Sequence, residues 1–423
     1  MVDIKFVREN IDLMKQVVKN KKINLDVDAF LELDKKRRAL IQESEQIKSE
    51  QKKMTKEQRD EAIKLKIKFK KLNQELEEIQ KKYDKAMLLV PNVYSENTPI
   101  GDSDNDNKEI FVSGKIPKFD FPVKDHIELG KELDIIDTQK GAHTSGFRGY
   151  YLKNQGALLH FGLMSMALDK LRDKGFVLMV PPTILREFAL TGSGHFPEGK
   201  DEIYQIANPG KLADGNETKE KFFLAGTSEP SVLAYYANTI LEEKDLPIKL
   251  AGFSQCYRSE VGSYGKDTKG LYRVHEFLKI EQVIISKADL EQSHILFEEL
   301  NKNAQEILKD LELPYRVVQV CSGDMGAGKY EMTDIETYMP SKGKYGETHS
   351  NSNLTDWQAR RLNIKYKTKD NEKKFVYTLN NTMIASPRIL IALLENHQQK
   401  HGTVLIPKAL QKYVGFKKID KKR

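Results

Sequence analysis

Two segments near the start of the chain place apolar residues at alternating spacings of three and four. The first series, from Phe30 to Met54, has polar residues at three of its eight heptad positions. The second series, from Leu65 to Val90, has an apolar residue at every heptad position. Heptad spacing of this kind is typical of helices that pair along a narrow apolar seam. Because residues 26–90 also lack glycine and proline, the pattern predicts two long antiparallel helices, joined near MTKEQ (54–58), that form a coiled-coil arm.

The rest of the chain has a different pattern. PNVYSENTPIGDSDNDNKEI (91–110) is polar and rich in turn-forming residues, which is typical of a linker. Beyond it, helix-like stretches (157–174, 229–243, 288–311 and 387–400) alternate with strand-like ones (176–181, 249–256, 271–286, 315–321 and 374–379). We therefore predict an α+β fold, in which the arm and its linker (1–105) precede a domain (106–423) built on an antiparallel β-sheet flanked by helices.

The charge balance permits a polyanionic partner without requiring one. The formal net charge is +7, from 69 Lys and Arg against 62 Asp and Glu, which is modest for 423 residues. The distribution is more informative, because KLKIKFKK on the second arm helix concentrates Lys64, Lys66, Lys68, Lys70 and Lys71. These lysines form either a solvated helix surface or a surface that contacts phosphates.

Several classes of protein are not expected. No run of about 18 apolar residues is present, so we predict no membrane-spanning helix, and MVDIKFVREN lacks the apolar core of a signal peptide. The two cysteines, Cys256 and Cys321, stand apart from any Cys/His cluster. We therefore expect no zinc site and a reduced, cytoplasmic protein.

The strongest candidate for a binding site is CYRSEVGSYGKDTKGLYRVHEFLKIEQV (256–283), where charges of both signs flank a glycine-rich run. Residues two apart on a strand share a face, so Arg258 should project with Glu260, and Phe277 with Lys279 and Glu281. If the two strands pair as a hairpin, a guanidinium, two carboxylates and an aromatic ring converge. Taken singly, these residues are more often surface ion pairs or core, but together they can hold a phosphate, an ammonium and a base.

The order of this segment resembles the second signature motif of class II aminoacyl-tRNA synthetases, and within that class most resembles the seryl-tRNA synthetase family. Further segments resemble that family in the same order, namely GFVLMVPPTILRE (175–187), FLAGTSEPS (223–231), ETHSNSNLTDWQARR (347–361) and TLNNTMIASPRILIALLENHQ (378–398). The N-terminal hairpin resembles the tRNA-binding arm of the family. The resemblance thus covers essentially the full chain.

The resemblance implies ATP-dependent ligation of L-serine to tRNA(Ser) through a seryl-adenylate, by a homodimer that uses Mg²⁺ with ATP. It leaves open whether tRNA(Sec) is also a substrate. The implied catalytic residues are Arg258, Arg388 and Glu347. The implied serine pocket comprises Thr227, Ser228, Glu229, Arg258, Glu281 and Thr382. The implied ATP site comprises Arg258, Ser259, Glu260, Val274, Phe277, Glu347, Thr348, His349, Ser350 and Arg388, of which Glu347 and Ser350 would also hold Mg²⁺.

Two basic segments acquire a role through the same resemblance. The five arm lysines would contact the long variable arm of the tRNA. GSYGKDTKG (262–270) would be a loop that contacts ATP or the acceptor end of tRNA, with Lys266 and Lys269 facing phosphate. Two departures from the family pattern precede Arg388. Ala385-Ser386-Pro387 stands where a glycine-rich run is common, and Asn381-Thr382 stands where other members have Gly-Ser.

Three alternatives remain at this point. A related synthetase for threonine or proline would be expected to carry a C-terminal anticodon-binding domain, and only 35 residues follow Arg388. A ligase that loads an amino acid onto a carrier protein would be expected to lack the long arm. A non-catalytic homologue would be expected to have lost Arg258, Glu260, Glu281 or Arg388, and all four are present.

Overall fold

The computed structural model describes residues 1–54, 58–208, 210–211, 214–261 and 270–420, and it contains two compact units. The units comprise residues 1–93 and 94–423. We expected the arm and its linker to extend to residue 105. Instead, residues 94–105 belong to the larger unit, where the Ser95 amide donates to the Tyr330 carbonyl (2.8 Å) and the Gly323 amide donates to the Gly101 carbonyl (3.0 Å).

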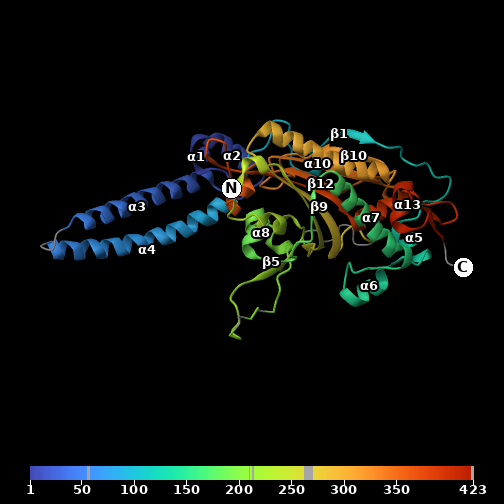
Figure 1. Ribbon diagram of the computed structural model, residues 1–423, viewed down its shortest axis with the longest axis horizontal. Helices are drawn as coiled ribbons and strands as arrows, with labels where there is room; N and C mark the ends of the chain where they lie inside the picture. The colour runs from blue at the N-terminus through green and yellow to red at the C-terminus, as the bar shows by residue number, and fades with distance from the viewer. Residues whose placement is uncertain (55–57, 209, 212–213, 262–269, 421–423) are drawn as a thin grey trace. The chain divides into compact units, whose positions relative to one another are not determined.

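The first unit contains the two long helices that the heptad pattern predicts. Helices α3 (Val27–Lys53) and α4 (Arg59–Leu89) contact each other along their length (Figure 1). Residues 55–57 of the expected connection lie outside the described residues. The seam buries Leu40, Ile47, Leu72 and Ile79, and Phe30 stacks on Tyr83 with ring centroids 5.6 Å apart.

Two polar residues of the α3 seam have polar partners on the opposite helix. The Ser44 hydroxyl lies 3.2 Å from Asn73 Oδ1, and Arg37 Nε donates to Gln80 Oε1 (2.6 Å). These pairs account for two of the three polar positions that interrupt the apolar series on α3. Two short helices that we did not anticipate, α1 (Ile4–Glu9) and α2 (Ile11–Asn20), join Phe30 and Tyr83 in one apolar cluster.

The second unit is built on the predicted sheet, which has eight strands in the order β1-β10-β11-β12-β15-β9-β8-β4. All neighbouring strands are antiparallel except β4 and β8, which are parallel. The strands are β1 (Lys108–Ser113), β4 (Val177–Met179), β8 (Ile248–Tyr257), β9 (Glu276–Ser286), β10 (Tyr315–Gln319), β11 (Glu331–Met339), β12 (Lys344–Asn353) and β15 (Tyr377–Ala385).

Several boundaries differ from the sequence prediction. The predicted helix 229–243 is wrong beyond Ala234, because residues 240–242 form strand β7, which pairs with β13. Strand β9 begins at Glu276, so residues 271–275 are not part of it. Strands β11 and β12 were not predicted at all. Polar residues occupy most positions of β12, including several buried ones, so an apolar strand pattern is missing there.

The remaining elements are short or lie around the sheet. The helices are α5 (His126–Glu132), α6 (Thr138–Ser145), α7 (Asn154–Asp173), α8 (Glu187–Ser193), α9 (Glu229–Ala234), α10 (Leu290–Asp310), α11 (Trp357–Leu362), α12 (Ser386–Asn396) and α13 (Lys408–Val414). The small strands are β2 (Ile136–Asp137), β3 (Tyr151–Leu152), β5 (Ile184–Arg186), β6 (Phe222–Leu224), β7 (Ile240–Glu242), β13 (Lys365–Lys367), β14 (Lys373–Phe375), β16 (Val404–Leu405) and β17 (Lys418–Ile419).

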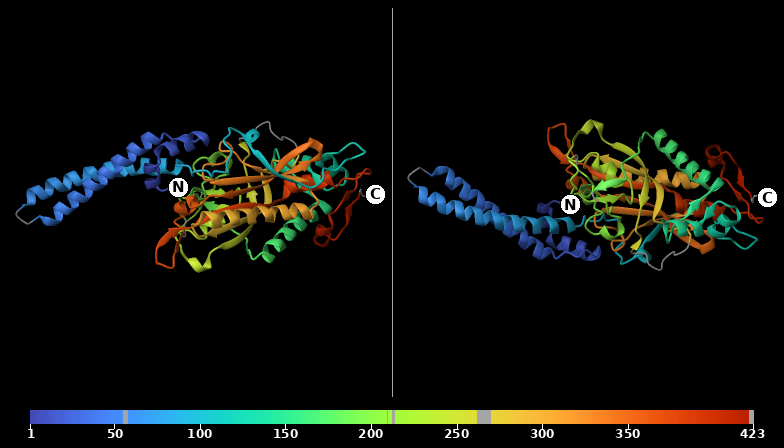
Figure 2. Two further views of the ribbon diagram at one scale, coloured as in Figure 1. Left: turned by 90° about the horizontal axis from the view of Figure 1, so that it is seen from above. Right: turned by 90° about the horizontal axis from the view of Figure 1, so that it is seen from below.

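Strand β9 divides the second unit into two sides. Ile280 and Ile284 join the main core with residues of α7, α10 and α12, and the left view of Figure 2 shows α10 running along the strands. Val283 and Ile285 face the other way and pack with α9 and α11. Strand alternation thus places helices on both faces and leaves the first part of the second face, before Val283, available for a cavity.

A buried amide network holds β9 against its neighbours. Gln282 Nε2 donates to Asn381 Oδ1 on β15 (2.7 Å), and Asn303 Nδ2 on α10 donates to Gln282 Oε1 (2.8 Å). All three side chains are buried, and buried amides of this kind are costly to leave unpaired. Among the described residues, no helix has the length and apolar character needed to cross a membrane.

Candidate active site

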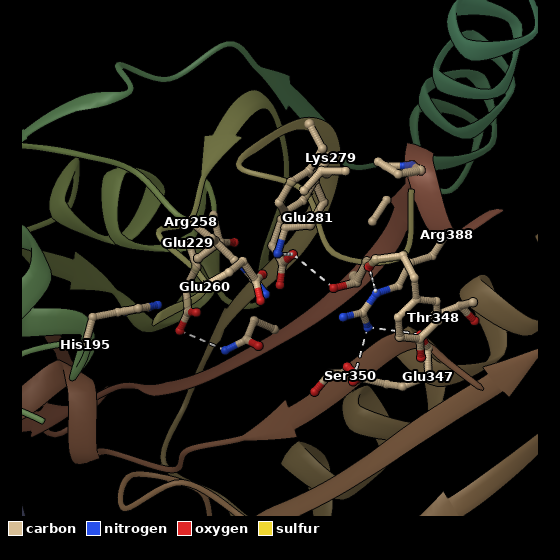
Figure 3. Close-up of a pocket in the computed structure, with 18 of the residues that line it drawn as sticks. His195, Glu229, Arg258, Glu260, Lys279, Glu281, Glu347, Thr348, Ser350 and Arg388 are labelled. Carbon is tan, nitrogen blue, oxygen red and sulfur yellow. Dashed lines mark hydrogen bonds and ion pairs between the residues drawn. The ribbon is translucent and has the colours of Figure 1, made fainter. Parts of the chain in front are cut away.

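A polar cavity opens on the second face of the sheet, next to the β8–β9 pair (Figure 3). Arg388, Glu347 and Ser350 lie at one end, and His195 and Glu229 lie at the other. The lining residues are His195, Thr227, Glu229, Arg258, Glu260, Tyr272, Val274, Phe277, Lys279, Glu281, Lys329, Glu347, Thr348, Ser350, Asn380, Thr382, Ala385, Pro387 and Arg388. The structure therefore brings together most of the residues that the sequence singled out.

The register of β8 and β9 explains which of their side chains enter the cavity. Phe277 pairs with Cys256, and Glu281 pairs with Gly252, so both project to the same face. Lys279 lies between them on that face and forms an ion pair with Glu281. We predicted this alternation for Phe277, Lys279 and Glu281, although only Phe277 and Glu281 were assigned to the site.

Arg258 and Glu260 reach the cavity by a route that we did not predict. Strand β8 ends at Tyr257, and Glu260 has a left-handed backbone (φ 55°), so the two residues do not share a strand face. The Arg258 amide donates to the His275 carbonyl (2.9 Å), and the Arg258 guanidinium lies 5.4 Å from the Phe277 ring centroid. Glu260 is held by Arg273, at 3.2 Å.

The end of the cavity near Glu229 and Glu281 is rich in buried oxygen atoms. Glu229 Oε1 accepts from Gln358 Nε2 (2.5 Å) and from Asn380 Nδ2 (2.9 Å). Burial raises the pKa of Glu281, although the ammonium of Lys279 opposes this shift. Thr227 Oγ1 is buried and has no hydrogen-bond partner in the part of the chain that the structure describes. This end can accept a small ligand that carries hydroxyl and ammonium groups.

The opposite end pairs an arginine with a carboxylate. Arg388 Nη1 lies 3.1 Å from Glu347 Oε2 and donates to the Glu347 carbonyl (3.0 Å). Partial burial opposes ionisation of Glu347, but the guanidinium groups of Arg388 and Arg258 bring its pKa below the ordinary value. Burial and the negative charge of Glu347 raise the pKa of the neighbouring Asp334 well above its usual range. This end combines cations for phosphate with oxygen atoms that suit a hard metal ion.

Three predicted site residues do not line the cavity. Ser228 is buried and donates to the Gly252 carbonyl (3.1 Å), whereas Ser259 donates to the Asp201 carbonyl (2.8 Å). His349 is buried beside Thr348, and burial lowers its pKa to about 4. Their hydrogen bonds support backbone and neighbouring side chains, so their positions do not favour direct contact with a ligand. Lys266 and Lys269 lie outside the described residues.

Sequence reasoning missed His195, which lies in the segment LTGSGHFP. Gly194 has φ 91°, and a Cβ there would lie 2.3 Å from the Trp357 ring, so only glycine fits. Gln358 Nε2 donates to the Ser193 carbonyl (2.8 Å), and Arg361 Nη1 donates to the Thr191 carbonyl (2.9 Å). Helix α11 thereby fixes the segment that carries His195 to the cavity. Lys329 was also missed, and no sequence pattern marks it.

Together, the antiparallel sheet and this cavity define the class of protein. Residues 211–397 match the tRNA synthetase class II core domain (G, H, P, S and T), and residues 1–94 match the seryl-tRNA synthetase N-terminal domain. The serine–tRNA ligase of Borreliella afzelii is 42% identical over 98% of both chains, and that of Deinococcus radiodurans is 41% identical over 99% of both. The chain belongs to the seryl-tRNA synthetase family.

Solved structures agree with this assignment. Seryl-tRNA synthetase from Pyrococcus horikoshii, solved in complex with ATP, superimposes with a TM-score of 0.92 and 36% identity over all of both chains. Prolyl-tRNA synthetase from Giardia lamblia, in complex with prolyl-adenylate, has a TM-score of 0.59 and 20% identity over 67% of this chain, so it shares the fold alone. The predicted family and fold are thereby confirmed.

His195 provides a test of how the cavity is built. Burial, assisted by the positive charges of Lys329 and Arg258, lowers the pKa of His195 to about 3. In the unfolded chain the imidazole takes up a proton below about pH 6.5, whereas in the folded chain it stays neutral. Its contribution to stability is therefore complete above about pH 6.5 and is lost as the pH falls towards 3.

In the wild-type protein the free energy of unfolding should fall between pH 7 and pH 5. In His195→Gln this fall should be smaller by about 2 kcal/mol. Urea unfolding at the two pH values measures this difference. His143→Gln, at an exposed position on α6, controls for the removal of one imidazole. An unchanged pH dependence in His195→Gln would show that the imidazole is accessible to protons in the folded protein.

Proposed function

We propose that the chain attaches L-serine to tRNA(Ser) in two steps. A serine carboxylate oxygen attacks the α-phosphorus of ATP, the bond to pyrophosphate breaks, and seryl-adenylate remains. A ribose hydroxyl of the terminal tRNA adenosine then attacks the serine carbonyl carbon, and AMP leaves. The observation that carries this proposal is one cavity that Arg258 lines together with a carboxylate-rich end, near Glu229 and Glu281, and an arginine-bearing end, near Arg388. Family membership supports the same activity.

Serine selection would follow from the polar groups at the end of the cavity near Glu229 and Glu281. Glu281 would accept from the serine ammonium, whose charge would stabilise the buried carboxylate in its ionised form. Thr227 Oγ1 has no hydrogen-bond partner among the described residues, and Thr382 Oγ1 contacts Glu281 Oε2 (3.4 Å). Alanine would leave such groups unpaired, and a polar site rejects a ligand that lacks the matching hydroxyl by a large factor.

ATP would lie across the remaining part of the cavity. Phe277 would stack on one face of adenine, the Val274 backbone would face the base edge, and Glu260 would accept from the adenine amino group. Arg388 would cover the other face of the base and reach the γ-phosphate. Arg258 would contact both the α-phosphate and the serine carboxylate, where its charge stabilises the crowded phosphorus during transfer. Catalysis then depends mainly on positioning and charge rather than on a strong base.

The donor groups at the Glu347 end fit a magnesium ion. Glu347 and Ser350 offer a carboxylate and a hydroxyl oxygen, which a hard cation prefers. Asp334 pairs with Ser350 across β11 and β12, and its buried Oδ1 has no hydrogen-bond partner among the described residues. Glu347 and Ser350 would hold Mg²⁺ together with ATP, and the bound ion would supply charge neutralisation for the phosphates.

Amino-acid-dependent pyrophosphate exchange tests this proposal. We expect exchange with serine, and none with alanine or threonine at equal concentration. Glu281→Gln keeps the side-chain shape and removes the charge, so the KM for serine should rise at least about tenfold while the KM for ATP changes less than about threefold. Exchange that depends on threonine instead of serine would overturn the assignment.

We also propose that the arm lysines contact tRNA phosphates. Lys64, Lys66, Lys70 and Lys71 are exposed on α4, and Lys68 forms an ion pair with Glu43 (2.9 Å). The first four are therefore the better candidates, because Lys68 already has an acidic partner. Proteins that recognise double-helical RNA read mainly its backbone and shape, which suits a rigid basic helix.

Replacing the four lysines Lys64, Lys66, Lys70 and Lys71 with alanine should raise the KM for tRNA about tenfold. The slope of log KM against log salt concentration should fall by about one for each phosphate contact that is lost. Serine-dependent pyrophosphate exchange should not change. A matched control removes four exposed lysines of the second unit, Lys108, Lys115, Lys118 and Lys131. Equal losses in both variants would indicate a net-charge effect and contradict a binding site on the arm.

A homodimer is the assembly that the surface of the second unit supports. Strand β4 is at the edge of the sheet, and Val177 is 58% exposed there. Helix α7 contacts β4 and exposes Leu158 and Phe161, and Val180 just beyond β4 is 83% exposed. A free strand edge flanked by apolar side chains is typical of a surface that a second copy covers.

Sedimentation velocity should give twice the 48.6 kDa mass of the chain. Phe161→Glu would place a charge in the covered surface and shift the protein towards monomer. Ile295→Glu, at an equally exposed apolar position on α10, should leave the mass unchanged. A wild-type protein that remains monomeric at micromolar concentration would refute the proposal.

A further inference from the structure

Residues 270–272 lead from the glycine-rich segment into the cavity, and the fold fixes their path. Gly270 has φ 82°, and a Cβ there would lie 2.2 Å from His126 Nε2. The Leu271 amide donates to His126 Nε2 (3.1 Å), while His126 Nδ1 lies 2.9 Å from the buried Glu395 carboxylate. Nδ1 therefore carries the imidazole proton and Nε2 accepts. This arrangement delivers Tyr272 to one defined place.

Tyr272 contacts both residues at the phosphate end of the cavity. The Arg388 guanidinium carbon lies 4.6 Å from the Tyr272 ring centroid, and Arg388 Nε donates to the Tyr272 carbonyl (3.3 Å). The Tyr272 hydroxyl donates to the Glu347 carbonyl (3.1 Å). Arg388 Nη1 donates to the same carbonyl. One tyrosine thus bridges the helix that carries Arg388 and the strand that carries Glu347.

We propose that Tyr272 is a positioning residue that holds Arg388 and Glu347 in the arrangement that receives the triphosphate of ATP. This inference rests on the proposed placement of ATP beside Arg388. An arginine side chain has many rotamers, and fixing it before the ligand arrives removes part of the entropic cost of binding. The aromatic ring restricts the guanidinium from one side, and the hydroxyl keeps the Glu347 backbone in register with it.

The surroundings of Tyr272 indicate a role beyond filling space. The residue is only partly buried, and it lines the cavity as well as packing against the edge of the main core. A Cβ at Gly346 would lie 3.0 Å from the Tyr272 hydroxyl, so strand β12 leaves room for that hydroxyl next to Glu347. The contacts of Tyr272 with Arg388 and Glu347 lie at the phosphate end of the cavity, so its effect should fall mainly on ATP.

The test compares Tyr272→Phe and Tyr272→Leu with the wild-type protein. Tyr272→Phe keeps the ring and loses one hydrogen bond, so the KM for ATP in pyrophosphate exchange should rise about three- to fivefold. Tyr272→Leu also loses the cation–π contacts of the ring with Arg388 and with Lys342 (Nζ 4.2 Å from the ring centroid), so the rise should be at least about tenfold. The KM for serine should change less than about twofold in both variants. Calorimetry with a non-hydrolysable ATP analogue and Mg²⁺ should show the same order in Kd without turnover.

Two further variants separate this inference from its alternatives. Tyr413→Leu is the matched control, because Tyr413 also has a cation near its ring (Lys412, 4.7 Å) and a hydroxyl hydrogen bond (Asp169, 3.0 Å) away from the cavity. It should lower the melting temperature without changing the affinity for ATP.

Arg388→Gln should weaken ATP binding more than Tyr272→Leu. If Arg388→Gln weakens it and Tyr272→Leu does not, the positioning role is refuted while the proposed ATP site stands. If neither does, the placement of ATP fails. Equal changes for serine and ATP in Tyr272→Leu would indicate general disruption and also refute the role.

Discussion

The arrangement of the cavity depends on the antiparallel register between β8 and β9. That register sends Phe277, Lys279 and Glu281 towards the ligand space and sends Ile280 and Gln282 towards the helices. A shift of one residue would bury an ammonium and a carboxylate against the apolar core, which is energetically prohibitive. The amide pairs of Gln282 with β15 and α10 therefore stabilise more than the core, because they also determine which side chains can meet a substrate.

The carboxylates at the two ends of the cavity lie in different environments. Burial raises the pKa of Glu281 despite the ion pair with Lys279, whereas two arginines outweigh the partial burial of Glu347 and lower its pKa. A substrate ammonium at the first end would stabilise the ionised form of Glu281, and phosphates at the second end would meet the arginines. Charges that are fixed before binding need little reorganisation during the reaction.

The sequence was sufficient for features that follow from periodicity or from ordered motifs. Heptads predicted α3 and α4, and strand alternation predicted that Phe277 and Glu281 share a face. It was insufficient where the fold uses polar residues in the interior. Strand β12 escaped prediction because buried hydroxyl and amide groups, paired across the sheet, replace an apolar pattern. His195 and Tyr272 escaped because their positions are set by distant partners, Trp357 and His126, which no local pattern connects to them.

The polar pairs in the arm have a consequence for how its length can vary. Ser44 with Asn73 and Arg37 with Gln80 are one heptad apart on both helices, so the two helices match at only one alignment. A change of length between the two pairs on one helix alone would break one of them, whereas residues 45–72 lie beyond both pairs along the chain and can lengthen or shorten without disturbing either. The paired segment therefore keeps one alignment while the far end of the arm is free to vary in length.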